Sequence, residues 1–169
     1  ERGMAQVFAN QLQYIRSGVH LVDLAAGNFA EVLAEPPGEA CLVIFEARRF
    51  SRLALILAQE AQAAGIPITL VTDAFCDWGH GVADEIFVVP TEFNLFWESN
   101  AQMASLANLL VNGVFIEMGA DVEERMNRIA ALYGRFTGHV GGSLSDLAPK
   151  SRPQKVAKAR ADRPPKGGK

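Results

Sequence analysis

Cysteine is scarce in this sequence: its 169 residues contain only Cys41 and Cys76. Two cysteines do not make a disulfide framework in a chain of this length, so we expect both as reduced thiols in the core. No apolar run approaches the roughly 20 residues that a membrane-spanning helix needs. Residues 1–18 have the pattern of an amphipathic helix and no signal-peptide cleavage site. These absences predict a cytoplasmic location.

Lysine is absent from the first 148 residues, which hold eight arginines and eighteen acids. Residues 149–169 hold eight Lys or Arg and one acid, and they have almost no large apolar residues. We therefore expect an acidic globular domain at 1–143 and a disordered basic tail at 144–169. Such a tail can touch nucleic acid through phosphates, but a solvated tail without a specific partner is the simpler interpretation.

Helical and strand patterns alternate along the chain. Strands are predicted at 19–24, 41–45, 68–72 and 86–89, and helices at 1–18, 28–35, 51–65, 96–118 and from Asp121 onward. The strands are apolar throughout, which is typical of a parallel sheet buried on both faces by helices. The sequence therefore predicts an α/β doubly wound fold.

Two adjacent arginines, Arg48 and Arg49, follow the strand at 41–45, and a helix with Ser51 as its N-cap begins directly after them. In a parallel α/β sheet, ligands bind at the carboxyl ends of the strands, and a helix N-terminus favours an anion. The pattern therefore predicts a phosphate or carboxylate ligand. The alternative is a surface pair that forms weak ion pairs with acids such as Glu46. We expect at least one of the two arginines to contact a ligand. Because adjacent residues point in different directions, the alternative in which only one faces the pocket stays open.

Other polar residues allow weaker interpretations. Thr72 and Asp73 end the third strand, where the hydroxyl can reach a sugar or Asp73 can cap a turn. Glu92 and Glu98 flank the predicted start of the long helix and are candidate bases for an isomerase, although the helix dipole alone favours acids there. An apolar stripe on that helix predicts core packing, with part of it available for a dimer interface. It comprises Phe93, Phe96, Trp97, Met103, Leu106, Leu109 and Leu110.

No metal or cofactor site is predicted. Asp73, Cys76, Asp77 and His80 form a loose cluster, but they complete no zinc-type spacing. His20 and His139 are isolated, and no Gly-x-Ser-x-Gly motif supports a catalytic triad.

Three runs, at 42–51 (LVIFEARRFS), 64–73 (AGIPITLVTD) and 82–92 (VADEIFVVPTE), together carry a family resemblance. In this order and spacing, residues 3–136 resemble the SIS (sugar isomerase) domain, and more narrowly the effector domain of RpiR/MurR-type bacterial transcriptional regulators. The resemblance implies a domain built on a flavodoxin-like parallel sheet. Such a domain binds a phosphosugar, forms a homodimer and, in the regulators, modulates an N-terminal helix-turn-helix domain. Carried onto this chain, it implies ligand contacts by Arg48, Arg49, Phe50, Ser51 and Thr72.

The chain departs from the family pattern in two places. Most SIS domains have a Ser-x-Ser-Gly-x-Thr/Ser loop after this strand. Residues 46–51 instead have the arginine pair followed by Phe50, and in this they resemble a subset of RpiR-like proteins with an Arg-Arg-aromatic loop. The family's first strand and its Gly/Ser-rich loop precede the first helix, which here begins at the start of the chain. We therefore expect a fragment without its first strand and DNA-binding domain, in which residues 19–24 pair with 41–45 or fray.

The leading hypothesis is a non-catalytic phosphosugar-sensing and dimerisation domain of a transcriptional regulator, which contacts DNA only through a missing N-terminal domain. Its alternatives are a sugar-phosphate isomerase that uses Glu92 or Glu98, and a degenerate SIS domain that only dimerises.

Overall fold

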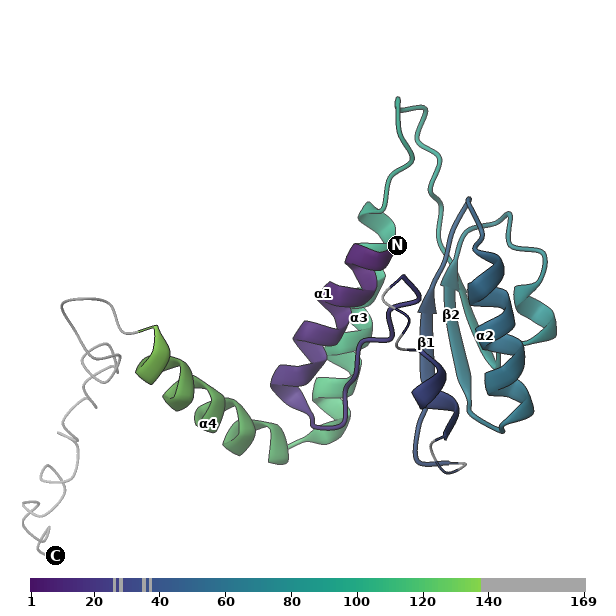
Figure 1. Ribbon diagram of the computed structural model, residues 1–169. Coiled ribbons are helices and arrows are strands. Elements are labelled where there is room, and N and C mark those ends of the chain that lie inside the picture. The colour runs from purple at the N-terminus through teal and green to yellow at the C-terminus, as the bar shows by residue number, and fades with distance from the viewer. Residues whose placement is uncertain (26, 28, 35, 37, 138–169) are drawn as a thin grey trace, which may run out of the picture. The chain divides into compact units, whose positions relative to one another are not determined.

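The computed structural model describes residues 1–25, 27, 29–34, 36 and 38–137. Residues 1–129 form one compact unit, and of a second unit the structure describes residues 130–137. The first unit contains a parallel sheet with the strand order β1-β2-β3 (Figure 1). The strands are β1 (Leu42–Phe45), β2 (Ile68–Thr72) and β3 (Glu85–Val88), and the helices are α1 (Arg2–Ile15), α2 (Arg52–Ala63), α3 (Ala101–Met118) and α4 (Asp121–Phe136). Two short 3₁₀ helices are η1 (Ala30–Ala34) and η2 (Gly79–Gly81).

The central strand β2 is buried on both faces, as its apolar sequence predicts. Its register aligns Leu42 with Ile68 on one side and Thr69 with Glu85 on the other. Ile68 and Leu70 face one layer of the core, while Val71 faces the other. This alternation explains the apolar residues of β2 and confirms the predicted α/β class.

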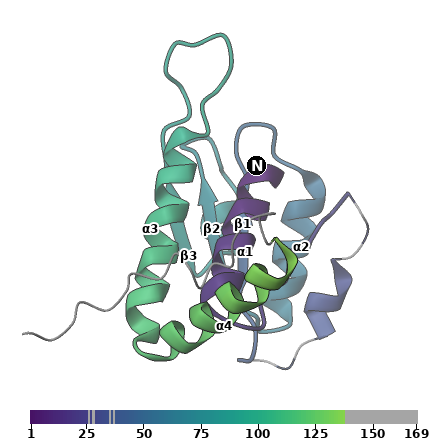
Figure 2. The same ribbon diagram turned by 90° about the vertical axis from the view of Figure 1, so that its left-hand side faces the viewer.

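Helix α2 covers one face of the sheet, and α1 and α3 lie side by side on the other (Figures 1 and 2). On the first face, Ala58 and Ala61 are fully buried, and these small side chains let α2 pack closely on the sheet. On the second face, the rings of Phe8 and Phe45 meet edge to face at 5.4 Å between centroids, and Met103 is fully buried. The three layers place the carboxyl ends of all three strands at one edge.

The predicted strand at 19–24 does not form: within it, only Asp23 makes a bridge. The carboxylate of Asp23 accepts a hydrogen bond from the Ala25 N–H at 3.0 Å and pairs with Arg2. Such local side-chain bonds compete with a strand ladder, so this segment crosses the edge of the sheet without joining it.

The long helix begins later than predicted, at Ala101 and not at Phe96. The Ser99 hydroxyl accepts the N–H of Ala101 at 3.2 Å, and the Ser99 N–H donates to the Thr91 carbonyl at 3.0 Å. These two bonds fix a loop at 92–98 in place of a first helical turn. Glu92 and Glu98 therefore lie in that loop and do not flank the helix start.

Two further expectations about burial are wrong. Strand β3 lies at the edge of the sheet and is only partly buried, with Val88 exposed. Cys41 is exposed and Cys76 is half-buried, so neither thiol lies in the core, although both are free. Cys41 immediately precedes β1, at the end of the sheet where the covering layers stop.

The remaining elements mostly agree with the sequence. α4 covers the helix predicted from Asp121, and Val122 is buried. Of the helix predicted at 28–35, residues 30–34 form η1, while Asn28 is outside the described residues. His139, the predicted domain boundary at 143 and the predicted basic tail also lie outside the described residues. No single described helix is long and apolar enough to cross a membrane, although α3 and α4 as a bent pair reach that length and composition.

Candidate functional site

The turn after β1 is held in place by the end of β2. The Glu46 N–H donates to the Val71 carbonyl at 3.0 Å, which continues the strand pairing by one residue. The chain then turns sharply, with Arg48 in the left-handed region at φ +57°. In that conformation, the Arg48 N–H points at the buried carboxylate of Asp73 and donates to its Oδ2 at 3.0 Å. The arginine pair is therefore fixed to the carboxyl edge of the sheet through its backbone.

Asp73 organises this edge. Its Oδ1 accepts the Phe75 N–H at 3.0 Å, which confirms the predicted Asp73-capped turn. Its Oδ2 accepts the Thr91 hydroxyl at 3.4 Å in addition to the Arg48 N–H. One carboxylate, only 2% exposed, thus connects the segments that follow β1, β2 and β3.

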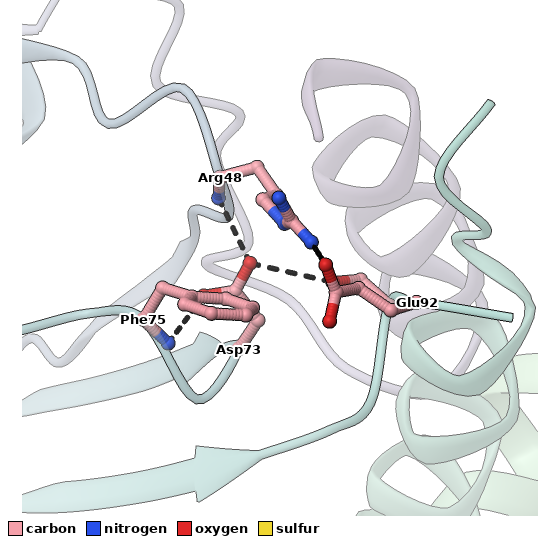
Figure 3. Close-up of polar contacts among 5 residues, drawn as sticks. Arg48, Asp73, Phe75 and Glu92 are labelled. Carbon is pink, nitrogen blue, oxygen red and sulfur yellow. Dashed lines mark hydrogen bonds and ion pairs between the residues drawn. The ribbon is translucent and has the colours of Figure 1, made fainter. Parts of the chain in front are cut away.

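The guanidinium of Arg48 has partners from two other segments (Figure 3). It lies 4.3 Å from the centroid of the Phe75 ring and forms an ion pair with Glu92. Its Nε is buried and has no hydrogen-bond partner. The expected alternative partner, Glu46, forms no ion pair with either arginine in the part of the chain that the structure describes.

Arg49 is exposed, and its guanidinium lies 5.2 Å from the centroid of the Trp97 ring. The two arginines therefore turn toward different partners, as expected of adjacent residues. Both nevertheless line one cavity of about 230 Å³. Its walls are Glu1, Ala47, Arg48, Arg49, Thr91, Trp97, Glu98 and Asn100. This cavity combines two cations with carboxylate, amide and aromatic groups at the carboxyl ends of the strands.

The N-terminus of α2 is occupied by a carboxylate of the chain itself. Ser51 has the extended conformation of an N-cap residue, but its side chain makes no capping hydrogen bond. Its N–H instead donates to Glu46 Oε1 at 3.0 Å. Burial raises the pKa of Glu46, and the hydrogen bond from Ser51 lowers it by a smaller amount. A carboxyl group of the chain itself therefore lies at this helix end, and a bound anion there stays a prediction.

A second cavity, of about 320 Å³, runs along the outer edge of β1. Apolar residues of the 21–25 segment, β1 and α2 form most of its wall, together with Glu46, Arg49 and Ser51. Arg49 thus borders both cavities, whereas Ser51 borders only this one. This second cavity lies beside the edge of β1 at which the sequence predicts a strand at 19–24, and that strand does not form.

The remaining predicted ligand residues lie outside both cavities. Phe50 is half-buried, and Thr72 is 1% exposed with a hydroxyl that has no hydrogen-bond partner. The described residues contain no group of three or more His, Cys, Asp or Glu that is arranged to hold a metal. Asp73, a member of the loose cluster seen in the sequence, is engaged by three protein donors instead.

Sequence reasoning missed Thr91, Trp97 and Asn100 as lining residues and considered Glu98 only as a catalytic base. Trp97 was predicted to lie on the apolar stripe of the long helix, which packs in the protein core. It lies instead in the loop at 92–98 and is exposed. A signal was present: Ser99 and Asn100 are residue types that begin helices. A later helix start would have separated Trp97 from the apolar stripe.

No family model matches the sequence, and no curated protein matches it significantly. Two solved structures have the same fold. The sugar isomerase domain of an RpiR transcription factor from Sphaerobacter thermophilus superposes with a TM-score of 0.65 at 16% identity, covering 78% of this chain and 73% of that one. The NanR protein of Vibrio vulnificus, complexed with ManNAc-6P, gives 0.65 at 14% identity, covering 82% and 53%.

The chain spans about half the length of NanR and about three quarters of the RpiR chain. It therefore has the fold of a sugar isomerase (SIS) domain, with a parallel sheet of three strands in the described residues.

Proposed function

We propose that this chain is the phosphosugar-sensing, non-catalytic domain of an RpiR/MurR-type cytoplasmic regulator. The observation that carries the proposal is the pair Arg48 and Arg49 on one cavity at the carboxyl edge of the sheet. Guanidinium groups bind phosphate through paired, charge-assisted hydrogen bonds. The NanR structure, which holds ManNAc-6P, supports a sugar phosphate as the ligand class.

The other wall of the cavity suits the sugar part of such a ligand. Glu98 and Asn100 offer hydrogen-bond acceptors and a donor for hydroxyl groups. We infer that the phosphate lies against the arginines and the sugar against Glu98 and Asn100, beside the fixed base of the 92–98 loop.

Thermal-shift measurements with a panel of sugar phosphates, ManNAc-6-phosphate included, test this function. A ligand at 100 times its Kd stabilises the folded chain by about 2.7 kcal/mol. We expect stabilisation of the wild type and its loss in Arg48→Ala and Arg49→Ala. Arg52→Ala is the matched control, because Arg52 is exposed on α2 and borders neither cavity. A panel that stabilises none of the proteins contradicts the proposal.

Dimerisation belongs to the same proposal and concerns the outer face of α1 and α3. Leu109 and Ile116, two turns apart on α3, are 67% and 64% exposed. Val7 and Tyr14 have the same spacing on α1, and the two helices are joined by a hydrogen bond between Gln11 and Asn108 at 3.0 Å. An apolar face of this kind is typical of an interface between copies.

Sedimentation analysis of the mass tests the dimer. We expect Leu109→Glu to shift the chain toward monomer, while Gln59→Glu, an equal charge change on exposed α2, leaves the mass unchanged. DNA contact would come from a helix-turn-helix domain outside this chain, as in the regulators that the sequence resembles.

An isomerase is the second candidate, favoured by Glu98 on the wall of the cavity. It predicts turnover of a phosphosugar that Glu98→Gln abolishes. A domain that only dimerises is the third, favoured by the pairing of Arg48 with Glu92. It predicts that Arg48→Ala leaves every response to sugar phosphates unchanged.

A further inference from the structure

The loop at 92–98 extends beyond the carboxyl ends of the strands (Figures 1 and 2). Several of its large apolar side chains are exposed. Phe96 is fully exposed, Leu95 and Trp97 are largely exposed, and Phe93 is 42% exposed. The base of the loop is fixed, because Thr91 is buried, donates to Asp73 and accepts the Ser99 N–H. The position of the loop above that base therefore depends on what its own side chains contact.

Two side-chain contacts of the described residues join the loop to the strand ends, and both involve the arginine pair. Glu92, the first loop residue, forms an ion pair with Arg48 (Figure 3). Trp97, near the end of the loop, lies against the guanidinium of Arg49. Each arginine thus holds one side of the loop.

Neither contact is strong. The Glu92 side chain is 60% exposed, and an exposed ion pair contributes only about 1.5- to 5-fold to an equilibrium constant. A cation–π contact at an exposed site contributes about 2- to 5-fold. A phosphate monoester carries nearly two negative charges and can accept paired hydrogen bonds from a guanidinium, so it competes well for both arginines.

We propose that Glu92 and Trp97 are internal competitors for the arginine pair, and that ligand binding releases the 92–98 loop from the strand ends. This inference rests on the proposed phosphosugar site and adds its regulation. The loop is the element through which occupancy of the site is transmitted. Glu92 also selects for strongly anionic ligands, because a ligand must displace its carboxylate from Arg48 in order to bind.

The anchor of Arg48 does not depend on the loop. Its N–H stays on Asp73, and Phe75 supports the guanidinium from the other side. Removing the Glu92 charge therefore leaves the arginine in position and removes only its competitor. This separates the effect of Glu92 on ligand binding from an effect on the shape of the site.

The test titrates the full chain with inorganic phosphate and follows binding by thermal shift and by Trp97 fluorescence. Trp78→Phe leaves Trp97 as the only tryptophan of the two in the sequence. This substitution is mild, because the Trp78 Nε1 is buried without a hydrogen-bond partner. Amide hydrogen exchange of residues 92–98 in the wild type reports release of the loop without any substitution.

We expect phosphate to shift the Trp97 emission and to speed amide exchange in the loop. Glu92→Gln should tighten phosphate binding about 1.5- to 5-fold, the contribution of an exposed ion pair. Glu85→Gln is the matched control: it removes the same charge at the opposite end of the sheet and should leave phosphate affinity unchanged.

Two outcomes overturn the inference in different ways. If phosphate stabilises the wild type but Glu92→Gln matches Glu85→Gln and loop exchange does not change, the proposed site stands and loop release is wrong. If neither phosphate nor any sugar phosphate binds to the wild type or to Glu92→Gln, the proposed function fails and takes this inference with it.

Discussion

The carboxylate of Asp73 accepts the backbone N–H of Arg48, so that a buried acid at the end of β2 fixes the arginine that follows β1. Parallel strands bring their carboxyl ends to one edge, which makes such a bond between residues 25 apart in sequence possible. The same carboxylate reaches Phe75 and Thr91. The arginine pair therefore belongs to a built edge of the sheet, not to a loose surface turn.

Replacement of Asp73 should destabilise the folded chain, because this carboxylate connects the segments that follow the three strands. Asp73→Ala leaves the N–H groups of Arg48 and Phe75 without their acceptor, and the expected loss of unfolding free energy is about 2 kcal/mol. Chemical denaturation measures it. Asp77→Ala, an exposed acid in the same connection, should stay within about 0.5 kcal/mol of the wild type. Equal losses in both variants would show that Asp73 has no organising role.

Arg48 combines a left-handed backbone with a functional side chain, and two substitutions separate these properties. Arg48→Gly and Arg48→Ala both remove the guanidinium and should lose the phosphate response equally. Because a side chain at φ +57° strains the backbone, the glycine variant should be more stable than the alanine variant by about 1 kcal/mol. Unfolding experiments on both proteins check this, and a more stable alanine variant would contradict the turn geometry.

Glu46 gives the domain a definite pH dependence. Burial raises its pKa in the folded chain above the ordinary value of 4.5, so the folded state binds the proton more tightly than the unfolded state. The resulting stabilisation is complete below the ordinary pKa and is lost as the pH rises through the raised one. Glu46→Gln keeps an acceptor for the Ser51 N–H and carries no charge.

We therefore expect Glu46→Gln to be more stable than the wild type at neutral pH, with the difference shrinking as the solution is acidified. Unfolding curves of both proteins across the acidic and neutral range measure this difference. A gap that widens toward low pH would show that the folded state favours the charged carboxylate instead.

Thr72 offers a test of the one predicted ligand residue that is fully buried. Its hydroxyl has no partner among the described residues, so Thr72→Val should leave stability unchanged or raise it. Because Thr72 borders neither cavity, the response to sugar phosphates should also persist. A lost response in a stably folded Thr72→Val protein would support the ligand role that the sequence predicted.

Much of the fold could be predicted because local patterns and tertiary burial agree in it. Strand β1 is a continuous apolar run, β2 is apolar except for Thr69 and Thr72, and Gly65 follows α2 in the left-handed region at φ +72°. The prediction failed where the two disagree. Residues 93–97 continue an apolar helical pattern into a loop, and Asp23 interrupts a strand-like run with its own side-chain bonds.

The candidate site was only half predictable for a related reason. Arg48 and Arg49 stand out because they follow a buried strand directly. Trp97, Glu98 and Asn100 come from a segment some fifty residues later, and only the folded chain brings them to the same cavity. The role of Glu46 was hidden as well, because its contact with Ser51 depends on the angle at which α2 leaves β1.

The most direct test of the central claim is calorimetric titration with the sugar phosphate that gives the largest thermal shift. Wild type, Arg52→Ala and the double variant Arg48→Ala/Arg49→Ala would be compared. The arginine-pair account predicts saturable binding to the first two proteins and at least a tenfold weaker Kd for the double variant, which corresponds to about 1.4 kcal/mol. Equal affinity in all three proteins would contradict it.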